Sequence, residues 1–221
     1  MKRICFVLMI AISLLPQILY GARKGEVADT LTASRVFADL PISVLDLVDR
    51  SRRLDMLDYY AADSIAKIPN AMEGLSYLDT VTPDYLKVVL TPVTTLGVKV
   101  LPGKKGDVIL TAYTIGDKDQ AYDTDLRFYD SSYQEIDRKK FMKLATLDDF
   151  FDYPDKAVKE LVARLVPFPT VLYEPEAGGS GMSARLTVGQ FMSADDYARI
   201  KQYLRPKLHY TWNGSKFNLE K

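Results

Sequence analysis

The sequence lacks cysteine almost entirely: among its 221 residues the only cysteine is Cys5. A bacterial lipid anchor requires a cysteine just after an apolar leader, whereas Cys5 lies near the start of such a run. Many small exported domains rely on disulfides, so the rest of this chain has to fold by burying a core. His209 is the single histidine, which excludes zinc sites built from several Cys or His ligands.

The chain also lacks an excess of charge of either sign, with 29 Lys and Arg residues against 29 Asp and Glu residues. A nucleic-acid-binding protein shows a basic excess or a basic stripe, so we expect no nucleic-acid partner. No long apolar run follows residue 22. We therefore expect that the processed chain does not span a membrane.

Residues 1–22 have the order of a secretory signal peptide. Lys2 and Arg3 are basic, 4–15 is apolar, and Pro16 breaks the run before the small residues Gly21 and Ala22. We expect cleavage after Gly21 or Ala22, with a retained N-terminal anchor as the alternative. The pattern predicts a periplasmic protein, or alternatively one that is extracellular or held at the cell surface.

The segment after the leader predicts short helices and then a loop. Residues 23–38 read as a loose lead-in, and Asp39 with Pro41 reads as the start of a helix. Ser51 is expected to cap a second helix that turns Leu54 and Leu57 inward. Residues 63–83 contain Pro, Asn and Gly and predict a loop with at most one short strand.

The middle of the chain predicts an antiparallel β-meander, because apolar or alternating runs are separated by turn residues. Residues 108–113 are apolar on both faces and predict a central strand. In the last run, Leu126 and Phe128 are expected to face the core, with Asp125, Arg127 and Tyr129 outward. The four expected strands are 86–90, 96–101, 108–115 and 124–129.

The second half predicts helices followed by more sheet. Thr146 and Asp155 are expected to begin helices, and Ser193 to begin another that ends at Pro206. Strands are expected near 170–173 and 184–188. The fold class is therefore α+β: an antiparallel meander packed against a few short helices. Residues 23–221 are expected to form a single domain, with a possible subdivision near residue 138.

The C-terminus predicts a β-hairpin around Asn213-Gly214, a favoured two-residue turn. This turn sets a register in which Tyr210 meets Phe217 and His209 meets Asn218. One face of the hairpin is then apolar and the other polar.

Two clusters suggest chemistry, but neither completes its motif. Asp117, Asp119, Asp123 and Asp125 suggest calcium, yet an EF-hand loop starting at Asp117 lacks the required glycine and the closing glutamate. We expect a solvated loop at 117–125, with weak calcium binding as the alternative. Residues 178–181 lack the lysine of a phosphate loop and a glycine of the nucleophile elbow, so a hairpin turn is expected.

We therefore predict no catalytic residues, no metal site and no cofactor. His209 is expected to face solvent. The 14 tyrosines suggest core packing, with carbohydrate or protein recognition as the alternative. Three Asp-Ser/Thr-apolar triplets resemble O-glycosylation sites of exported proteins in some Gram-negative anaerobes. Their acceptors, all in expected loop or terminus, are Thr30, Ser64 and Thr80.

Several segments, taken in order, carry a resemblance to one family. The whole resembles an exported bacterial family known as domain of unknown function 3256, found in gut and oral anaerobes. This resemblance implies export from a Gram-negative cell and supplies no activity or catalytic residues. The segments are 45–50, 54–59, 82–88, 97–102, 126–130 and 210–214.

Three hypotheses of function follow. The first is an exported periplasmic accessory or binding protein without catalysis, whose partner is another envelope protein or a glycan. The second is a carboxylate-dependent hydrolase of envelope carbohydrate or peptide, which would need two acidic side chains in one cleft. The third is a structural subunit of a cell-envelope assembly, which would need an exposed apolar patch.

Overall fold

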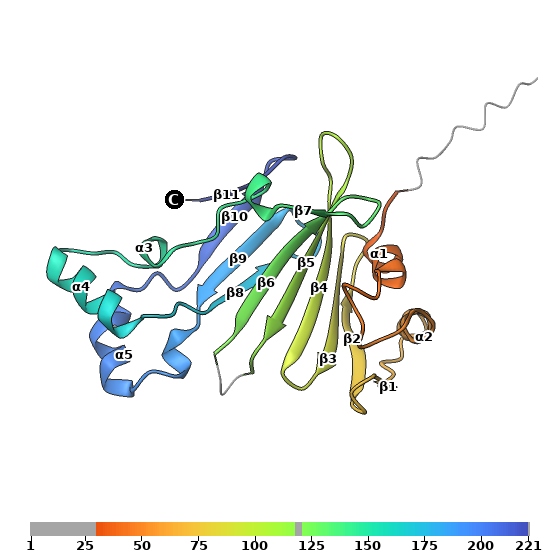
Figure 1. Cartoon of the computed structure of the whole chain (residues 1–221), viewed down its shortest axis with the longest axis horizontal. Coiled ribbons are helices and arrows are strands. Elements are labelled where there is room, and N and C mark those ends of the chain that lie inside the picture. The colour runs from red at the N-terminus through yellow and green to blue at the C-terminus, as the bar shows by residue number, and fades with distance from the viewer. Residues whose placement is uncertain (1–29, 118–120, 221) are drawn as a thin grey trace, which may run out of the picture. The chain divides into compact units, whose positions relative to one another are not determined.

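The computed structural model describes residues 30–117 and 121–220. Leu31–Lys221 form one compact unit that contains two antiparallel sheets and several short helices (Figure 1). This architecture confirms the α+β prediction. The described residues include no helix that is long and apolar enough to cross a membrane.

Sheet 1 has seven strands arranged in chain order, as a meander requires. The four strands expected from the sequence are confirmed, each within one or two residues. The central strand pairs on both sides, so that Gly97 meets Ala112 across one interface and Leu126 meets Ala112 across the other. The strands are β1 (Ile68–Pro69), β2 (Leu75–Val81), β3 (Tyr85–Thr91), β4 (Thr94–Leu101), β5 (Val108–Ile115), β6 (Asp123–Tyr129) and β7 (Glu135–Ile136).

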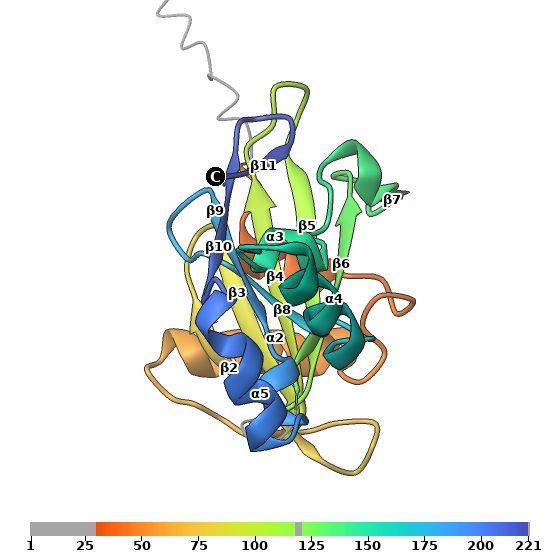
Figure 2. The same ribbon diagram turned by 90° about the vertical axis from the view of Figure 1, so that its left-hand side faces the viewer.

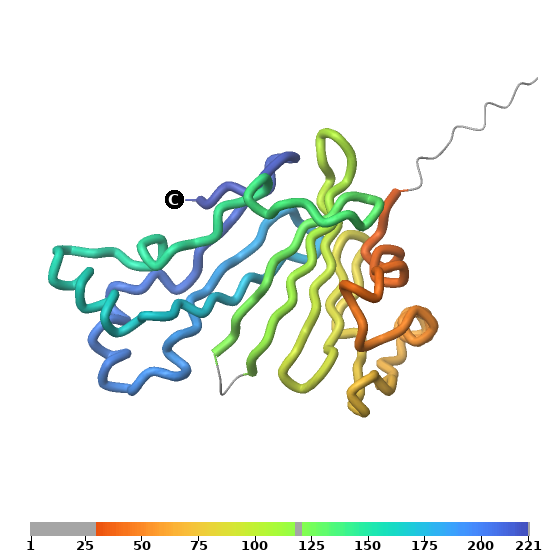
Figure 3. The backbone as a smooth tube through the Cα atoms, viewed as in Figure 1, coloured from red at the N-terminus to blue at the C-terminus, as the bar shows by residue number. Residues whose placement is uncertain are grey.

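Sheet 2 has four strands in the order β11-β10-β9-β8. Figure 3 shows the chain running outward after β7 and returning in β8. These strands are β8 (Val171–Pro175), β9 (Gly181–Leu186), β10 (Leu208–Trp212) and β11 (Phe217–Leu219). The helices are α1 (Ala33–Asp39), α2 (Arg50–Ala61), η1 (Arg138–Lys140), α3 (Leu147–Phe150), α4 (Lys156–Leu165), η2 (Val188–Gln190), α5 (Ala194–Ile200) and η3 (Lys201–Tyr203).

Each face of sheet 1 packs against a different partner. On one face, α1 and α2 cover the alternate apolar residues of β3 and β4, including Leu86, Val88 and Val98. On the other face, sheet 2 and the later helices cover β5 and β6, where Leu110, Leu126 and Phe128 are buried. Sheet 1 is therefore shared by two hydrophobic clusters, one on either side of it (Figures 1 and 2).

The expected start of the helical region is wrong. Residues 41–49 form turns, and the first helix is α1, inside the segment read as a loose lead-in. Thr32 caps α1 by accepting from the Arg35 amide, and Val36 and Phe37 are fully buried. This spacing of apolar residues, three and four apart after a capping threonine, is a helix signal that was present in the sequence.

The second helix is confirmed and Leu57 packs against the core as expected, but the cap and the position of Leu54 differ from the prediction. Asp49 rather than Ser51 caps α2, accepting from the Arg52 amide at 3.0 Å. Leu54 is 37% exposed, whereas Arg53 is buried with Met56. The Arg53 guanidinium donates through Nη1 to the carbonyls of Phe37 and Leu40, so it closes the C-terminal end of α1.

The segment 63–83 contains more strand than the expected loop. Its turn-forming residues lie at the strand ends: Asn70 closes the β1–β2 turn and Pro83 lies between β2 and β3. The buried Asn70 amide donates to Ser76 and to the Leu90 carbonyl, and its oxygen accepts from the Gly74 amide. These side-chain bonds add to the backbone bonds of the turn, in which the Asn70 backbone amide donates to the Gly74 carbonyl at 2.9 Å.

The helices of the second half are confirmed. Thr146 and Asp155 are the N-caps of α3 and α4, and Ser193 caps α5 by accepting from the Asp196 amide. Figure 2 shows α3, α4 and α5 gathered on the side of the strands nearest the viewer. Tyr129 of β6 was expected to face outward but is buried, because the cluster beneath α1 and α2 extends to it.

The C-terminal hairpin is confirmed, but its register is shifted by two residues. Tyr210 pairs with Leu219 and Trp212 with Phe217, since the turn centres on Gly214-Ser215 rather than Asn213-Gly214. The Asn213 side chain accepts from the amides of residues 215 and 216, each at 3.0 Å. A register shift of two residues keeps each side chain on the same face of the hairpin, so Tyr210 and Trp212 are buried and His209 is exposed.

Candidate binding groove

A groove lies on the half of sheet 1 that sheet 2 does not cover. Its inner pocket holds about 250 Å³ and its outer pocket about 530 Å³. The two pockets adjoin, since both are lined by Lys87, Thr95, Thr114, Leu172 and Glu174. The inner pocket adds Asp79, Thr80, Tyr85, Gly97, Ala112 and Pro175, and the outer pocket adds Tyr77, Val89, Pro92, Val93, Tyr122 and Arg185.

The floor of the groove follows from strand register. Lys87 pairs with Gly97, and Gly97 pairs with Ala112. Across these three strands a long side chain is thus followed by glycine and alanine, which have almost none. The next row contains Thr95 opposite Thr114. Because residues in register share a face, the small pair makes the hollow and the threonines line it with hydroxyls.

Tyr85 explains why position 97 is glycine. A Cβ at Gly97 would lie 3.2 Å from the Tyr85 hydroxyl and 3.3 Å from its ring, closer than ordinary contact. The tyrosine ring therefore packs against the bare backbone of β4. Burial raises the pKa of Tyr85 to about 12, and the charges of Glu174 and Asp79 add to the effect.

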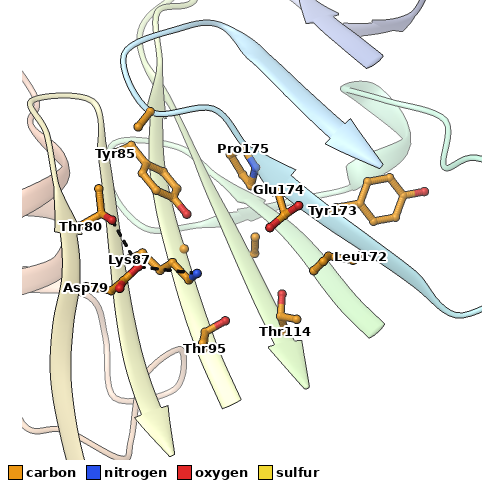
Figure 4. A pocket seen from close by; sticks show the side chains of 13 residues that line it. Asp79, Thr80, Tyr85, Lys87, Thr95, Thr114, Leu172, Tyr173, Glu174 and Pro175 are labelled. Carbon is orange, nitrogen blue, oxygen red and sulfur yellow. Dashed lines mark hydrogen bonds and ion pairs between the residues drawn. The ribbon is translucent and has the colours of Figure 1, made fainter. Parts of the chain in front are cut away.

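Two ion pairs face the groove from opposite walls. Lys87 lies 3.7 Å from Asp79 on sheet 1, and Arg185 lies 3.8 Å from Glu174 on sheet 2. Figure 4 shows Lys87 and Glu174 directed into the pocket, whereas the ring of Tyr173 points away from it. All four charged side chains are between 37% and 49% exposed, so a ligand can reach them.

A buried lysine holds the turn at one end of the groove. Lys99 donates to Asp84 at 2.5 Å and to the Glu176 carbonyl at 2.7 Å. Asp84 also accepts from Thr82 and from the Gly178 amide. Partial burial works to raise the pKa of Asp84, but the hydrogen bonds from Lys99 and Thr82 and the Lys99 charge lower it below its usual value. These contacts fix the β8–β9 turn over sheet 1.

The edge of sheet 2 is closed where it meets sheet 1. The Val171 amide donates to Asp123 at 3.2 Å and the Tyr173 amide donates to Thr124 at 3.1 Å. The next outward position is Pro175, which has no amide hydrogen. The outward amides of β8 are thus satisfied or absent along the groove.

The structure places the three O-glycosylation candidates apart from one another in the fold. Thr30 is exposed ahead of α1, and Ser64 is exposed in the loop after α2. Thr80 was expected in a loop but lies in β2 and lines the inner pocket, with its hydroxyl 3.3 Å from Asp79. Their glycosylation stays a prediction.

The acidic loop does not assemble a ligand set in the part that the structure describes; Asp119 lies outside that part. Asp123 accepts from the Val171 amide, and Asp125 forms an ion pair with Arg127 at 2.8 Å. No group of three or more His, Cys, Asp or Glu side chains suited to a metal occurs in residues 30–117 and 121–220.

The remaining motifs serve the fold. Residues 176–180 form the turn of the β8–β9 hairpin, as expected for the glycine-rich segment, and Gly178 has a φ of 72°. His209 is exposed on β10 as expected, but it pairs with Ser183 rather than meeting Asn218. Its Nδ1 lies 3.9 Å from Glu176.

The groove residues were not identified as a site from the sequence. The meander prediction contained part of the signal, because alternation along 85–89 puts Tyr85, Lys87 and Val89 on one face. Which half of that face stays open depends on where sheet 2 packs.

Fold and site together define a two-sheet α+β protein with a mixed-charge groove on one sheet face. The chain belongs to the family described as protein of unknown function DUF3256, whose model matches residues 27–217. It is similar in fold to a domain of an uncharacterized protein from Porphyromonas gingivalis W83, with a TM-score of 0.73 and 18% identity. That similarity covers 85% of this chain and 96% of the other. The comparison with curated proteins gave no match.

Proposed function

We propose that this protein is an exported, non-catalytic accessory or binding protein that holds its ligand in the groove. The observation that carries the proposal is the hollow over Gly97 and Ala112, rimmed by two ion pairs that a ligand can reach. Concave sites with a few convergent polar groups and volumes of about 300–1,000 Å³ are typical of ligand binding. Export rests on the leader sequence and on the family resemblance.

The test uses ¹⁵N-labelled protein titrated with size-fractionated extracts of the host's cell envelope. We expect one fraction to perturb the backbone amides of Lys87, Gly97 and Thr114. The variant Thr95→Phe, which places a ring on the groove floor, should abolish these shifts. Thr211→Phe, at an exposed position of β10, is the matched control and should leave them unchanged. Shifts confined to other surfaces, or no shifts with any fraction, contradict the proposal.

The second candidate function is a carboxylate-dependent hydrolase of envelope carbohydrate or peptide. It is favoured by one observation: Asp79 and Glu174 both line the inner pocket. Two carboxyl groups on either side of a bond can act as acid and base or nucleophile. Reproducible release of fragments from an envelope substrate, lost in Asp79→Asn and in Glu174→Gln, would replace the binding proposal with this one.

A structural subunit is the third candidate. Val93 and Ile115, at neighbouring strand ends of the meander, are 40% and 56% exposed. A small exposed apolar pair is common on monomers. Isolation of the protein from its host in a stoichiometric complex, with this pair protected from solvent, would favour the structural role.

A further inference from the structure

We infer that the ligand of the groove is a neutral oligosaccharide, an inference that rests on the function proposed above. The first reason is charge. Three carboxylates, Asp79, Asp117 and Glu174, and two cations, Lys87 and Arg185, line the groove. A site for a phosphorylated or polyanionic ligand gathers cations, and a site for a cation gathers carboxylates without them. The mixture here suits a ligand that is polar but uncharged.

The second reason is hydrogen bonding. The carboxylates only accept, the ammonium and guanidinium groups only donate, and the threonine hydroxyls do both. The Thr95 hydroxyl forms no hydrogen bond with another described residue, and it lies half-buried on the floor. Each sugar hydroxyl can both donate and accept. A sugar ring with several hydroxyls can therefore hydrogen-bond to the carboxylates, to the cationic donors and to the threonine hydroxyls of the groove.

The third reason is the apolar surface between the charges. The half-buried side chains of Tyr77, Val89 and Tyr122 line the outer pocket. In the inner pocket Tyr85 and Leu172 are only 9% and 7% exposed. A sugar ring has C–H groups on its faces and hydroxyls on its rim. Tyrosine and aliphatic side chains can contact those faces while the ion pairs contact the rim.

The alternative of an extended peptide is disfavoured by the closed edge of sheet 2. Peptides that add to a sheet use the main-chain groups of an exposed edge. Along the groove the β8 amides of Val171 and Tyr173 already donate to Asp123 and Thr124, and Pro175 has no amide hydrogen. The groove therefore offers side chains rather than main chain as partners.

The length of the groove suggests more than one sugar ring. The inner and outer pockets meet at Lys87 and Glu174, which line both. A ligand with one ring in each pocket would place its glycosidic link between these two charged side chains.

The experiment titrates the ¹⁵N-labelled protein with chitotriose, cellotriose and maltotriose. The comparison probes are trigalacturonate, which is anionic, and the tripeptide Ala-Tyr-Ala. We expect at least one neutral trisaccharide to shift the amides around Lys87, Gly97 and Thr114 in a saturable way. Trigalacturonate should bind at least about tenfold more weakly, since its carboxylates would meet Asp79 and Glu174, and the two cations of the groove are already paired with these residues.

Two variants test the contacts. Lys87→Met and Arg185→Met each remove a charged donor and should weaken trisaccharide binding by about tenfold or more. Arg199→Met is the matched control: Arg199 forms an ion pair of similar exposure with Asp196 on α5, far from the groove lining. It should leave the affinity within about twofold.

The results distinguish a failure of the oligosaccharide inference from a failure of the proposed binding function. Groove shifts with the tripeptide or trigalacturonate, and none with the neutral sugars, overturn the oligosaccharide inference and keep the binding proposal. Neutral-sugar binding that Lys87→Met and Arg185→Met leave unchanged also overturns it. If no probe and no envelope fraction perturbs the groove, the inference and the proposed function both fail.

Discussion

Asp84→Asn is expected to destabilise the protein more than Lys99→Met, although the two residues form one ion pair. The side chain of Lys99 is 1% exposed and that of Asp84 is 35% exposed. Asparagine carries no negative charge, so the buried Lys99 ammonium loses its counter-charge and keeps the neutral Glu176 carbonyl. The one amide oxygen of asparagine can accept either from Lys99 or from Thr82 and Gly178, but not from both sides. Methionine instead leaves a carboxylate that water reaches and that still accepts from Thr82 and Gly178.

The magnitudes follow from this difference in burial. A buried charge left without its partner costs about 3–5 kcal/mol, so Asp84→Asn should lower the free energy of unfolding by that amount. Lys99→Met removes hydrogen bonds to a reachable carboxylate and a carbonyl while keeping an apolar stem, so we expect about 1–3 kcal/mol. The double variant should resemble Lys99→Met alone, because it no longer contains the buried charge.

The assay is urea unfolding of the three variants and the parent protein. Asp148→Asn is the control, because Asp148 and Lys159 form an ion pair at 2.7 Å with both side chains more than half exposed. It should lower the free energy of unfolding far less than Asp84→Asn does, because water screens an exposed ion pair. Equal losses for Asp84→Asn and Lys99→Met, or a double variant with the sum of both losses, would refute the argument from burial.

The pH dependence gives a second measurement on the same variants. Hydrogen bonds from Lys99 and Thr82 lower the pKa of Asp84 against the opposing effect of partial burial. Its contribution to stability is therefore present above the pKa of the unfolded chain and is lost as the pH falls through the lower pKa of the folded state. Asp84→Asn should remove this acid-side loss.

Four further outcomes are expected. Between about pH 10 and pH 12 Tyr85→Phe should lose roughly 3 kcal/mol less stability than the parent, because burial raises the pKa of Tyr85 to about 12. Equal alkaline unfolding curves would contradict this. Arg53→Met should cost about 2–4 kcal/mol, since it leaves the carbonyls of Phe37 and Leu40 without their donor, whereas Arg52→Met should be nearly neutral by urea unfolding. Gly214→Ala should cost about 1–2 kcal/mol, because Gly214 has a φ of 85°, and thermal unfolding would measure it. N-terminal sequencing of the protein from its host should begin at residue 22 or 23; a chain beginning at Met1 would support a retained anchor.

The parts of the fold that the sequence predicted well have local causes. The strands of the meander are bounded by turn residues at every end, and Thr146, Asp155 and Ser193 cap their helices through bonds within the first turn. The error at the C-terminal hairpin has a local cause too. Asn213-Gly214 can occupy the two central turn positions, but the Asn213 side chain instead holds the amides of 215 and 216. The contact of Trp212 Nε1 with the Pro102 carbonyl at 2.7 Å accompanies this register.

The parts that failed depend on partners distant in sequence. From the sequence, Arg53 is expected on the exposed face of a helix. In the structure it is buried, because it donates to the carbonyls of Phe37 and Leu40. Tyr129 alternates with charged residues along β6, which suggests an exposed face. The cluster beneath α1 and α2 nonetheless covers it. Periodicity identifies residues that share a face and leaves open what covers that face.

The groove is the clearest example, because it is produced by two residues with almost no side chain and by a sheet that stops short of them. Lys87 on β3 and Lys99 on the neighbouring β4 share one face of sheet 1, two residues apart in register, and both alternate with apolar residues. Sheet 2 and its turn cover Lys99, which becomes a buried support, and leave Lys87 partly exposed in the groove. The same pattern therefore yields one lysine that supports the fold and one that faces the groove. The difference between the two lysines depends on the position of the β8–β9 turn. Lys99→Met should therefore lower the free energy of unfolding, whereas Lys87→Met should change ligand binding without unfolding the protein.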